Sequence, residues 1–176
     1  MSESNAMDFS VPINVFVDAA RDFCAWCETP RVHNPARLAF ETSRHLARLY
    51  AAAIELPEVD LDDYPEPEPV SIEAKRSMFV SFAALPFNYY REVFYSNSEH
   101  ADEPVVGDLA DDLTDIYCDL HVGLAIFDSG NESAAVWYWR FSFGAHWGRH
   151  AVCALRAIHC HESLGNAEGK GMEHDP

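Results

Sequence analysis

The chain has 176 residues, 48% of them hydrophobic, which favours one domain with a substantial buried core. Twelve basic and 29 acidic residues give a formal net charge of −17, and a field of that sign repels phosphate backbones and anionic lipid. We therefore expect no nucleic acid and no membrane as a partner. A solvated acidic surface is the simpler reading of the charge, and a protein partner would be basic. The oligomeric state stays open.

The cysteine pattern indicates a reducing compartment. Five cysteines, an odd number, lie mostly inside helical patterns, which suits free thiols in the cytoplasm better than a disulfide framework. Cys24 and Cys27 form a lone Cys-x-x-Cys, and no second pair completes a zinc ribbon. Both fall late in a predicted helix rather than at its N-terminus, so we expect core thiols. No stretch reaches the roughly 18 uninterrupted apolar residues of a membrane helix.

The first half of the chain predicts two helices and a connector. Residues 1–9 form a flexible tail, and apolar residues at three- and four-residue spacing then predict a helix from about Pro12 to Thr29. Asn34 and Pro35 are a typical cap and first position for a second helix, which runs to about Leu56. Residues 56–70 are acidic and rich in proline, which predicts a partly extended connector inside the domain.

The second half predicts three more helices. Ser71 caps a third helix that ends before Pro86, and a fourth spans residues 107–130. Residues 87–104, between them, are expected to form a short helix or an extended segment that covers the core. A β-hairpin would need a second strand to pair with this segment, and we find none in the sequence. A fifth helix ends near residue 162, and residues 163–176 are a polar, disordered tail. The sequence thus predicts an all-α, single-domain bundle of about five helices over residues 10–162, with the fourth and fifth as its central pair.

The fifth helix carries two neighbouring stripes. The first consists of apolar or small residues, namely Phe141, Gly144, Gly148, Ala151, Leu155 and Ile158. Its two glycines suggest that a neighbouring helix approaches closely, for example the fourth helix at Gly123. The other stripe mixes aromatic, imidazole and thiol groups, namely Trp139, Phe143, His146, His150 and Cys153. In this second stripe His146, His150 and Cys153 have the spacing of metal ligands, for Zn²⁺ or Fe²⁺. Packed, hydrogen-bonded histidines are the alternative.

An edge of the fourth helix carries a ladder of carboxylates at Asp108, Asp112, Asp115 and Asp119. Like charges one turn apart destabilise a helix by about 0.2–0.5 kcal/mol each, so guanidinium or imidazole groups, a divalent ion or water must offset them. The candidates for a polar edge or ligand-binding site are therefore Asp112, Asp115, Asp119, Trp139, Arg140, Trp147, Arg149 and Arg156. A small-molecule pocket between Trp139, Trp147 and Arg140 is a further reading.

Two segments of these helices, DDLTDIYCDLHVGL at 111–124 and WRFSFGAHWGRHAVCALRAIH at 139–159, resemble a bacterial family of unknown function, DUF5063. The resemblance implies a helical bundle of about this size and no assigned activity. The family's signature positions correspond to Asp112, Asp115, Asp119, Trp139, Arg140, His146, Trp147, Gly148, His150, Arg156 and His159.

Two functions are compatible with these patterns. The first is a non-enzymatic cytoplasmic binding or accessory protein, expected from the acidic surface, the acidic connector and the lack of a complete catalytic constellation. The alternative is a metal-dependent enzyme, hydrolase-like, with an Asp/His site between the fourth and fifth helices around Asp112, Asp115, Asp119, His146 and His150.

Overall fold

The structure, a computed structural model, describes residues 10–29, 34–61, 68–93 and 103–170. The predicted tail at 1–9, part of the connector and residues 171–176 lie outside these ranges. The described elements, in order, are α1 (Ser10–Glu28), α2 (Pro35–Ile54), α3 (Ile72–Ser81), a 3₁₀ turn (Phe82–Ala84), β1 (Tyr89–Glu92), β2 (Val105–Asp108), α4 (Leu109–Asp128), α5 (Glu132–Ser142), a π-helical turn η2 (Phe143–Trp147) and α6 (Gly148–Lys170).

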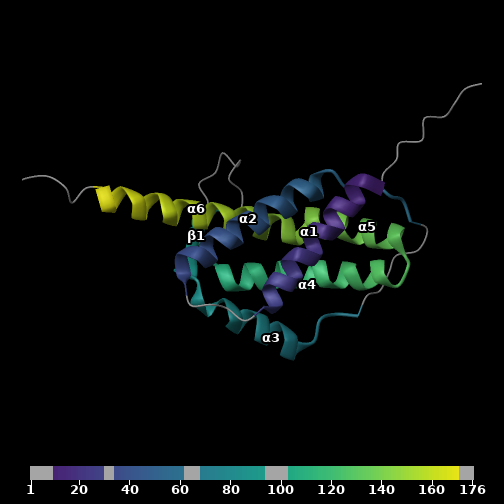
Figure 1. Cartoon of the computed structure of the whole chain (residues 1–176), viewed down its shortest axis with the longest axis horizontal. Coiled ribbons are helices and arrows are strands. Elements are labelled where there is room, and N and C mark those ends of the chain that lie inside the picture. Colours follow the sequence, from purple (N-terminus) through teal and green to yellow (C-terminus); the bar gives the residue numbers. More distant parts are fainter. Residues whose placement is uncertain (1–9, 30–33, 62–67, 94–102, 171–176) are drawn as a thin grey trace, which may run out of the picture.

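The elements pack into one mostly helical domain, which confirms the predicted fold class (Figure 1). Because α5, η2 and α6 follow one another without a break, they form one long helical run alongside α4. Helices α1 and α2 pack against this pair, and α3 packs against α4. The core between them holds large, fully buried side chains, among them Phe16, Phe23, Leu46, Leu113, Trp139 and Trp147. No helix in the described ranges is long and apolar enough to cross a membrane.

The helices begin where the sequence provides a cap. The side chain of Asn34 accepts a hydrogen bond from the backbone N–H of Arg37, and Ser71 accepts one from Ala74, so both predicted caps are confirmed. α4 is capped in the same way by Asp108, whose carboxylate accepts from the backbone of the next turn at 3.1 Å. The fourth predicted helix therefore begins at Leu109 and not at Gly107.

A short hairpin corrects the sequence analysis of residues 87–108. β1 pairs with β2 in an antiparallel register that places Tyr90 opposite Gly107. We did not recognise the partner run, Val105–Asp108, in the sequence and placed its last two residues, Gly107 and Asp108, at the start of the fourth helix. A side chain at Gly107 would meet the ring of Tyr90, so glycine lets that ring lie against the β2 backbone.

The π-helical turn changes which residues of the long helical run are buried. Buried positions follow the α-helical spacing up to Ser142, and the next buried residue is Trp147, five positions later. The wide turn shifts the pattern, since a π turn has one residue more than an α turn. As a result, Phe141 and Gly144 of the predicted apolar stripe are exposed, whereas Gly148, Ala151 and Ile158 are buried.

One further boundary and the glycine contacts differ from the prediction. α6 continues to Lys170, so the helix does not end at residue 162. The predicted close approach of Gly123 to the glycines of the fifth helix is not found, because the indole of Trp139 occupies the place where a Cβ of Gly123 would lie. Gly148 packs against Phe143 of its own helical run, and Gly144 faces open space.

Candidate metal centre between α4 and α6

Three aspartates of α4 face two histidines across the helix pair. Asp112, Asp115 and Asp119 occupy successive turns of α4, and His146 and His150 come from η2 and α6. The imidazoles, rather than Arg140, therefore contact this acidic edge. The sequence placed both groups of residues correctly, because three- and four-residue spacing keeps each group on one side of its helix.

His150 is held on one side by a buried carboxylate. Its Nδ1 lies 2.6 Å from Oδ1 of Asp112, and its Nε2 lies 3.8 Å from Oδ2 of Asp115. The side chain of Asp112 is only 8% exposed, so this hydrogen bond is largely shielded from water. The contact with Asp112 is the main cause that raises the pKa of His150, against the opposing effect of burial.

His146 repeats the arrangement one turn earlier. Its Nδ1 lies 2.8 Å from Oδ2 of Asp119, and its Nε2 lies 3.7 Å from Oδ2 of Asp115. Burial raises the pKa of Asp119, and the hydrogen bond from His146 offsets part of that rise. Each imidazole thus uses Nδ1 for its own carboxylate and turns Nε2 to the same oxygen of Asp115.

Two tyrosines support the outer carboxylates. The hydroxyl of Tyr90, on β1, donates to Oδ2 of Asp112 at 2.5 Å, and that of Tyr138, on α5, donates to Asp119 at 3.5 Å. Burial is the first cause that raises the pKa of both phenols, so both stay protonated donors at neutral pH. Neither tyrosine was a candidate from the sequence. Tyr138 directly precedes Trp139, but Tyr90 reaches the site only through the unpredicted hairpin.

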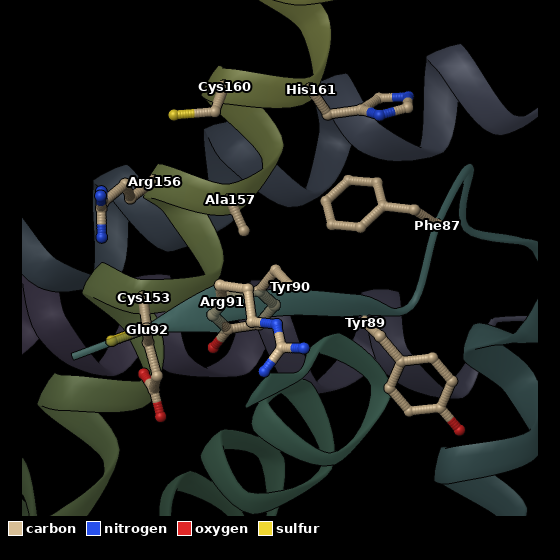
Figure 2. A pocket seen from close by; sticks show the side chains of 10 residues that line it. All are labelled: Phe87, Tyr89, Tyr90, Arg91, Glu92, Cys153, Arg156, Ala157, Cys160 and His161. Atoms are coloured by element: carbon tan, nitrogen blue, oxygen red, sulfur yellow. The ribbon is translucent and has the colours of Figure 1, made fainter. Parts of the chain in front are cut away.

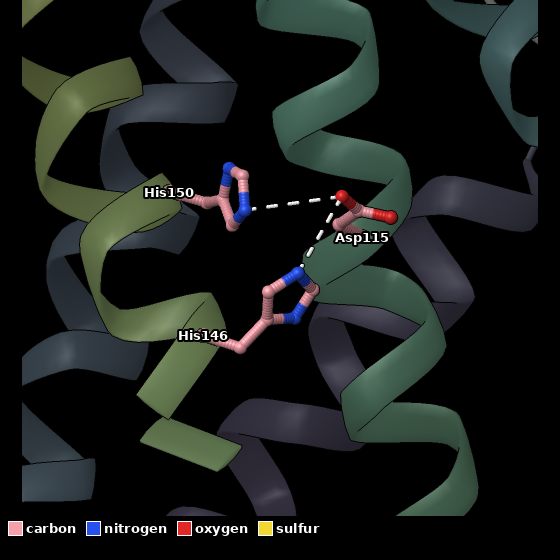
Figure 3. Close-up of side chains that lie close together, drawn as sticks. All are labelled: Asp115, His146 and His150. Atoms are coloured by element: carbon pink, nitrogen blue, oxygen red, sulfur yellow. Dashed lines mark ion pairs between the residues drawn. The ribbon is translucent and has the colours of Figure 1, made fainter. Parts of the chain in front are cut away.

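The inner atoms of this group could hold one metal ion. One ligand atom each from Asp115, His146 and His150 lie within 4.8 Å of one another, and Figure 3 shows both rings turned toward the carboxylate. Two ligands about 2.1 Å from a tetrahedral ion lie roughly 3.4 Å apart. The Asp115–imidazole separations of 3.7 and 3.8 Å are close to that value, whereas the two imidazole nitrogens, within 4.8 Å of each other, must approach further when an ion binds. The third predicted ligand, Cys153, is not in the group. Burial raises the pKa of its thiol to about 12, and Glu92 contacts it.

The remaining candidates lie elsewhere. Trp139 and Trp147 are fully buried and contact Phe16, with ring centroids 4.9 and 6.2 Å away. Within the part of the chain that the structure describes, neither indole is exposed to line a pocket with Arg140, so the structure gives no support to that reading of the sequence. Arg140 instead holds the connector, through the carbonyl of Leu56 and, at 3.3 Å, the carboxylate of Glu58. Arg149 and Arg156 are exposed on α6.

Comparisons with known proteins agree with the fold and assign no activity. The structure resembles that of protein BF1032 from Bacteroides fragilis, with a TM-score of 0.72 over 86% of this chain and 92% of that chain. The two sequences are 24% identical, so the likeness shows the fold alone. No curated protein matches the chain. A family described as a domain of unknown function, DUF5063, matches residues 8–163, and the chain therefore belongs to that family.

Proposed function

We propose that this protein binds one divalent transition-metal ion, Zn²⁺ or Fe²⁺, through Asp115, His146 and His150, and that it acts as a metal-dependent enzyme of hydrolytic type. The orientation of the two imidazoles carries the proposal. Both rings direct Nε2 to one carboxylate oxygen, at 3.7 and 3.8 Å, and both are fixed in that orientation by a second carboxylate on Nδ1. Metal-bound histidines in proteins have this second partner almost without exception.

Charge supports a cation at this position. An ionised carboxylate only accepts hydrogen bonds, so Asp112 and Asp119 require the proton on Nδ1 of each ring. In the neutral tautomer Nε2 then carries a lone pair, and both lone pairs point toward Asp115. A divalent ion satisfies these three ligand atoms together. The alternative source of positive charge is protonation of both imidazole rings. Metal-binding measurements distinguish the two, because only the first alternative requires that the protein binds added metal.

The partial exposure of the site favours catalysis over a purely structural ion. Structural zinc sites have four protein ligands and are closed, whereas catalytic sites have three and keep a position for water. Here the side chains of His146 and Asp115 are 46% and 30% exposed, so water and a substrate can approach. A bound divalent ion lowers the pKa of water to about 7, which provides hydroxide for attack on an ester, amide or phosphoester.

The surface supports a second candidate, a non-enzymatic binding protein. None of the side chains of α3 is fully buried, and its Ile72, Phe79 and Val80 are 80%, 41% and 63% exposed. A pull-down with the untagged chain, with and without Ile72→Ser and Val80→Ser, tests this candidate. Loss of a specific partner in the variant would support it, and an absence of any partner would remove it. Five free cysteines support a reducing, cytoplasmic location under either candidate.

Metal analysis of untagged protein tests the leading proposal. The chain is purified without chelator, and Zn, Fe and Mn are measured in the wild type, in His146→Ala/His150→Ala and in His159→Ala. We expect about one ion per chain in the wild type and in His159→Ala, whose exposed imidazole lies on the same helix outside the site. The double variant should hold none. Wild-type protein that binds none of these ions, even when they are added, would contradict the proposal.

A further inference from the structure

A cleft lies between β1 and α6, and it does not include the three inner ligands of the candidate metal centre. Its volume is about 320 Å³, and its walls come from the segment 87–92 and from one side of α6 between Cys153 and His161 (Figure 2). Clefts that bind small molecules start at roughly this volume. The cleft is therefore large enough for a ligand with one or two fused rings, but not for a folded partner.

Aromatic rings form much of the wall. Phe87 and His161 pack against each other at one end, with ring centroids 4.7 Å apart and planes 32° apart. The ring of Tyr90 lines the β1 side, and the small side chain of Ala157 lines the α6 side. Such surfaces favour a flat, unsaturated ligand, because stacked and edge-to-face ring contacts stabilise planar groups.

The cleft also concentrates positive charge in a strongly acidic chain. Arg156 lies on the α6 side and forms no ion pair among the described residues, and Arg91 lies on the β1 side, with a 3.4 Å contact to the carbonyl of Pro104. Glu92 is the one carboxylate in the lining, and it is engaged with the thiol of Cys153. Two arginines thus line a cleft on a protein whose formal net charge is −17. Guanidinium groups bind planar carboxylates through paired hydrogen bonds.

We infer that this cleft binds a small organic anion, an aromatic or otherwise unsaturated carboxylate, with its ring against Tyr90 and the packed pair of Phe87 and His161, and its carboxylate on Arg156. Arg91 stands on the opposite side, where it adds a second positive charge. The inference does not depend on the metal centre, although Tyr90 belongs to both sites: its ring lines the cleft, and its hydroxyl binds Asp112.

Titration calorimetry with 2-naphthoate and its uncharged analogue 2-naphthamide tests the inference. The full chain is used metal-free, in EDTA, so that the result is independent of whether the metal proposal holds. For a ligand of roughly 13 non-hydrogen atoms we expect a Kd for 2-naphthoate of about 1 mM or tighter. The amide should bind about tenfold more weakly, because it lacks the charge-assisted hydrogen bonds.

Arg156→Gln separates this cleft from non-specific binding. We expect the variant to lose the preference for the acid over the amide, and to keep the circular dichroism spectrum and unfolding temperature of the wild type, because Arg156 is exposed. Arg76→Gln, which removes the same charge from an exposed position on α3, should keep the preference. Equal binding of the two ligands by the wild type, an unchanged preference in Arg156→Gln, or no binding of 2-naphthoate at about 5 mM would each overturn the inference.

Discussion

Asp112 binds Nδ1 of His150 at 2.6 Å, and this contact fixes how the imidazole faces the rest of the site. The other carboxylate oxygen of Asp112 accepts from the hydroxyl of Tyr90, so the carboxylate is itself held from two sides. With the proton on Nδ1, the free ring nitrogen of His150 points toward Asp115. Asp112 therefore acts as a positioning residue, and its importance can be measured separately from that of the ligands.

Asp112→Asn should weaken zinc binding without abolishing it. The amide oxygen can still accept from His150, but it carries no charge, and loss of such an outer partner costs about 10- to 100-fold in metal affinity. Competition with a chromophoric chelator measures the affinity. Asp111→Asn, an exposed neighbour on α4, is the matched control and should bind zinc as the wild type does. Equal affinity in Asp112→Asn and in the control would show that Asp112 does not position His150.

Tyr90→Phe should affect the two sites differently. The change removes the hydroxyl that donates to Asp112 and keeps the ring that lines the cleft beside α6. We expect zinc affinity to fall by about three- to tenfold, which is less than in Asp112→Asn. The effect is smaller because the Tyr90 hydroxyl does not bind the ligand His150 itself but the carboxylate that positions it. Calorimetry with 2-naphthoate on the same variant should give the wild-type Kd. A parallel loss of both affinities would mean that the substitution disturbs the hairpin as a whole.

Zinc should raise the unfolding temperature of the protein. A ligand at 100 times its Kd stabilises the folded state by about 2.7 kcal/mol, which corresponds to roughly 5–10 °C for a chain of this size. Differential scanning calorimetry with zinc and with EDTA measures the difference. His146→Ala/His150→Ala should unfold at one temperature under both conditions, whereas a shift of similar size in that variant would place the zinc elsewhere.

The sequence predicted the helices well because most of them have a start signal, an apolar periodicity, or both. Asn34 and Ser71 cap their helices as expected, and the carboxylates of α4 share one side because of their spacing. The hairpin was not predictable in the same way. Its strands have four residues each and are separated in sequence, so their pairing depends on tertiary contacts such as Tyr90 over Gly107.

The carboxylates and imidazoles of the candidate site were predictable from the sequence, and its tyrosines were not. Asp112, Asp115, Asp119, His146 and His150 were all proposed around one ion, and the structure brings them together. Cys153 was expected as a ligand because an uninterrupted α-helix continues the stripe through it. Which three atoms converge depends on how the two helices face each other, and helical spacing alone does not determine that. Tyr90 arrives from a different part of the chain altogether.

Gly123→Ala should destabilise the protein, and Gly144→Ala should not. A Cβ at Gly123 would overlap the indole of Trp139, which is fully buried and cannot move aside, so we expect a loss of about 1–3 kcal/mol. A Cβ at Gly144 meets nothing within 4 Å, and the better helix propensity of alanine should leave stability unchanged or raise it by up to about 1 kcal/mol. Urea unfolding gives both free energies. Equal effects at the two glycines would contradict the close packing of α4 on α5.

His45 should make the protein less stable at mildly acidic pH. Its imidazole is buried and stacks on Trp26 with centroids 5.0 Å apart, and burial is the main cause that lowers its pKa below 6.5. Arg44 and Arg48 lower the pKa further, while Asp22 and Glu41 oppose them. Below pH 6.5 the unfolded chain therefore binds a proton that the folded chain does not, so stability falls as the pH falls toward the lower folded-state pKa.

Comparison with His45→Phe isolates this effect, because phenylalanine keeps the ring in the core and cannot be protonated. We expect the free energy of unfolding of the wild type, relative to that of the variant, to be constant well above pH 6.5 and to decrease as the pH falls below about 6.5. Urea unfolding in EDTA at several pH values measures both curves. The exposed His159, changed to Phe in the same way, should leave the pH dependence of the wild type intact. A constant difference between wild type and His45→Phe over the whole range would show that His45 accepts a proton as easily in the folded chain as in the unfolded one.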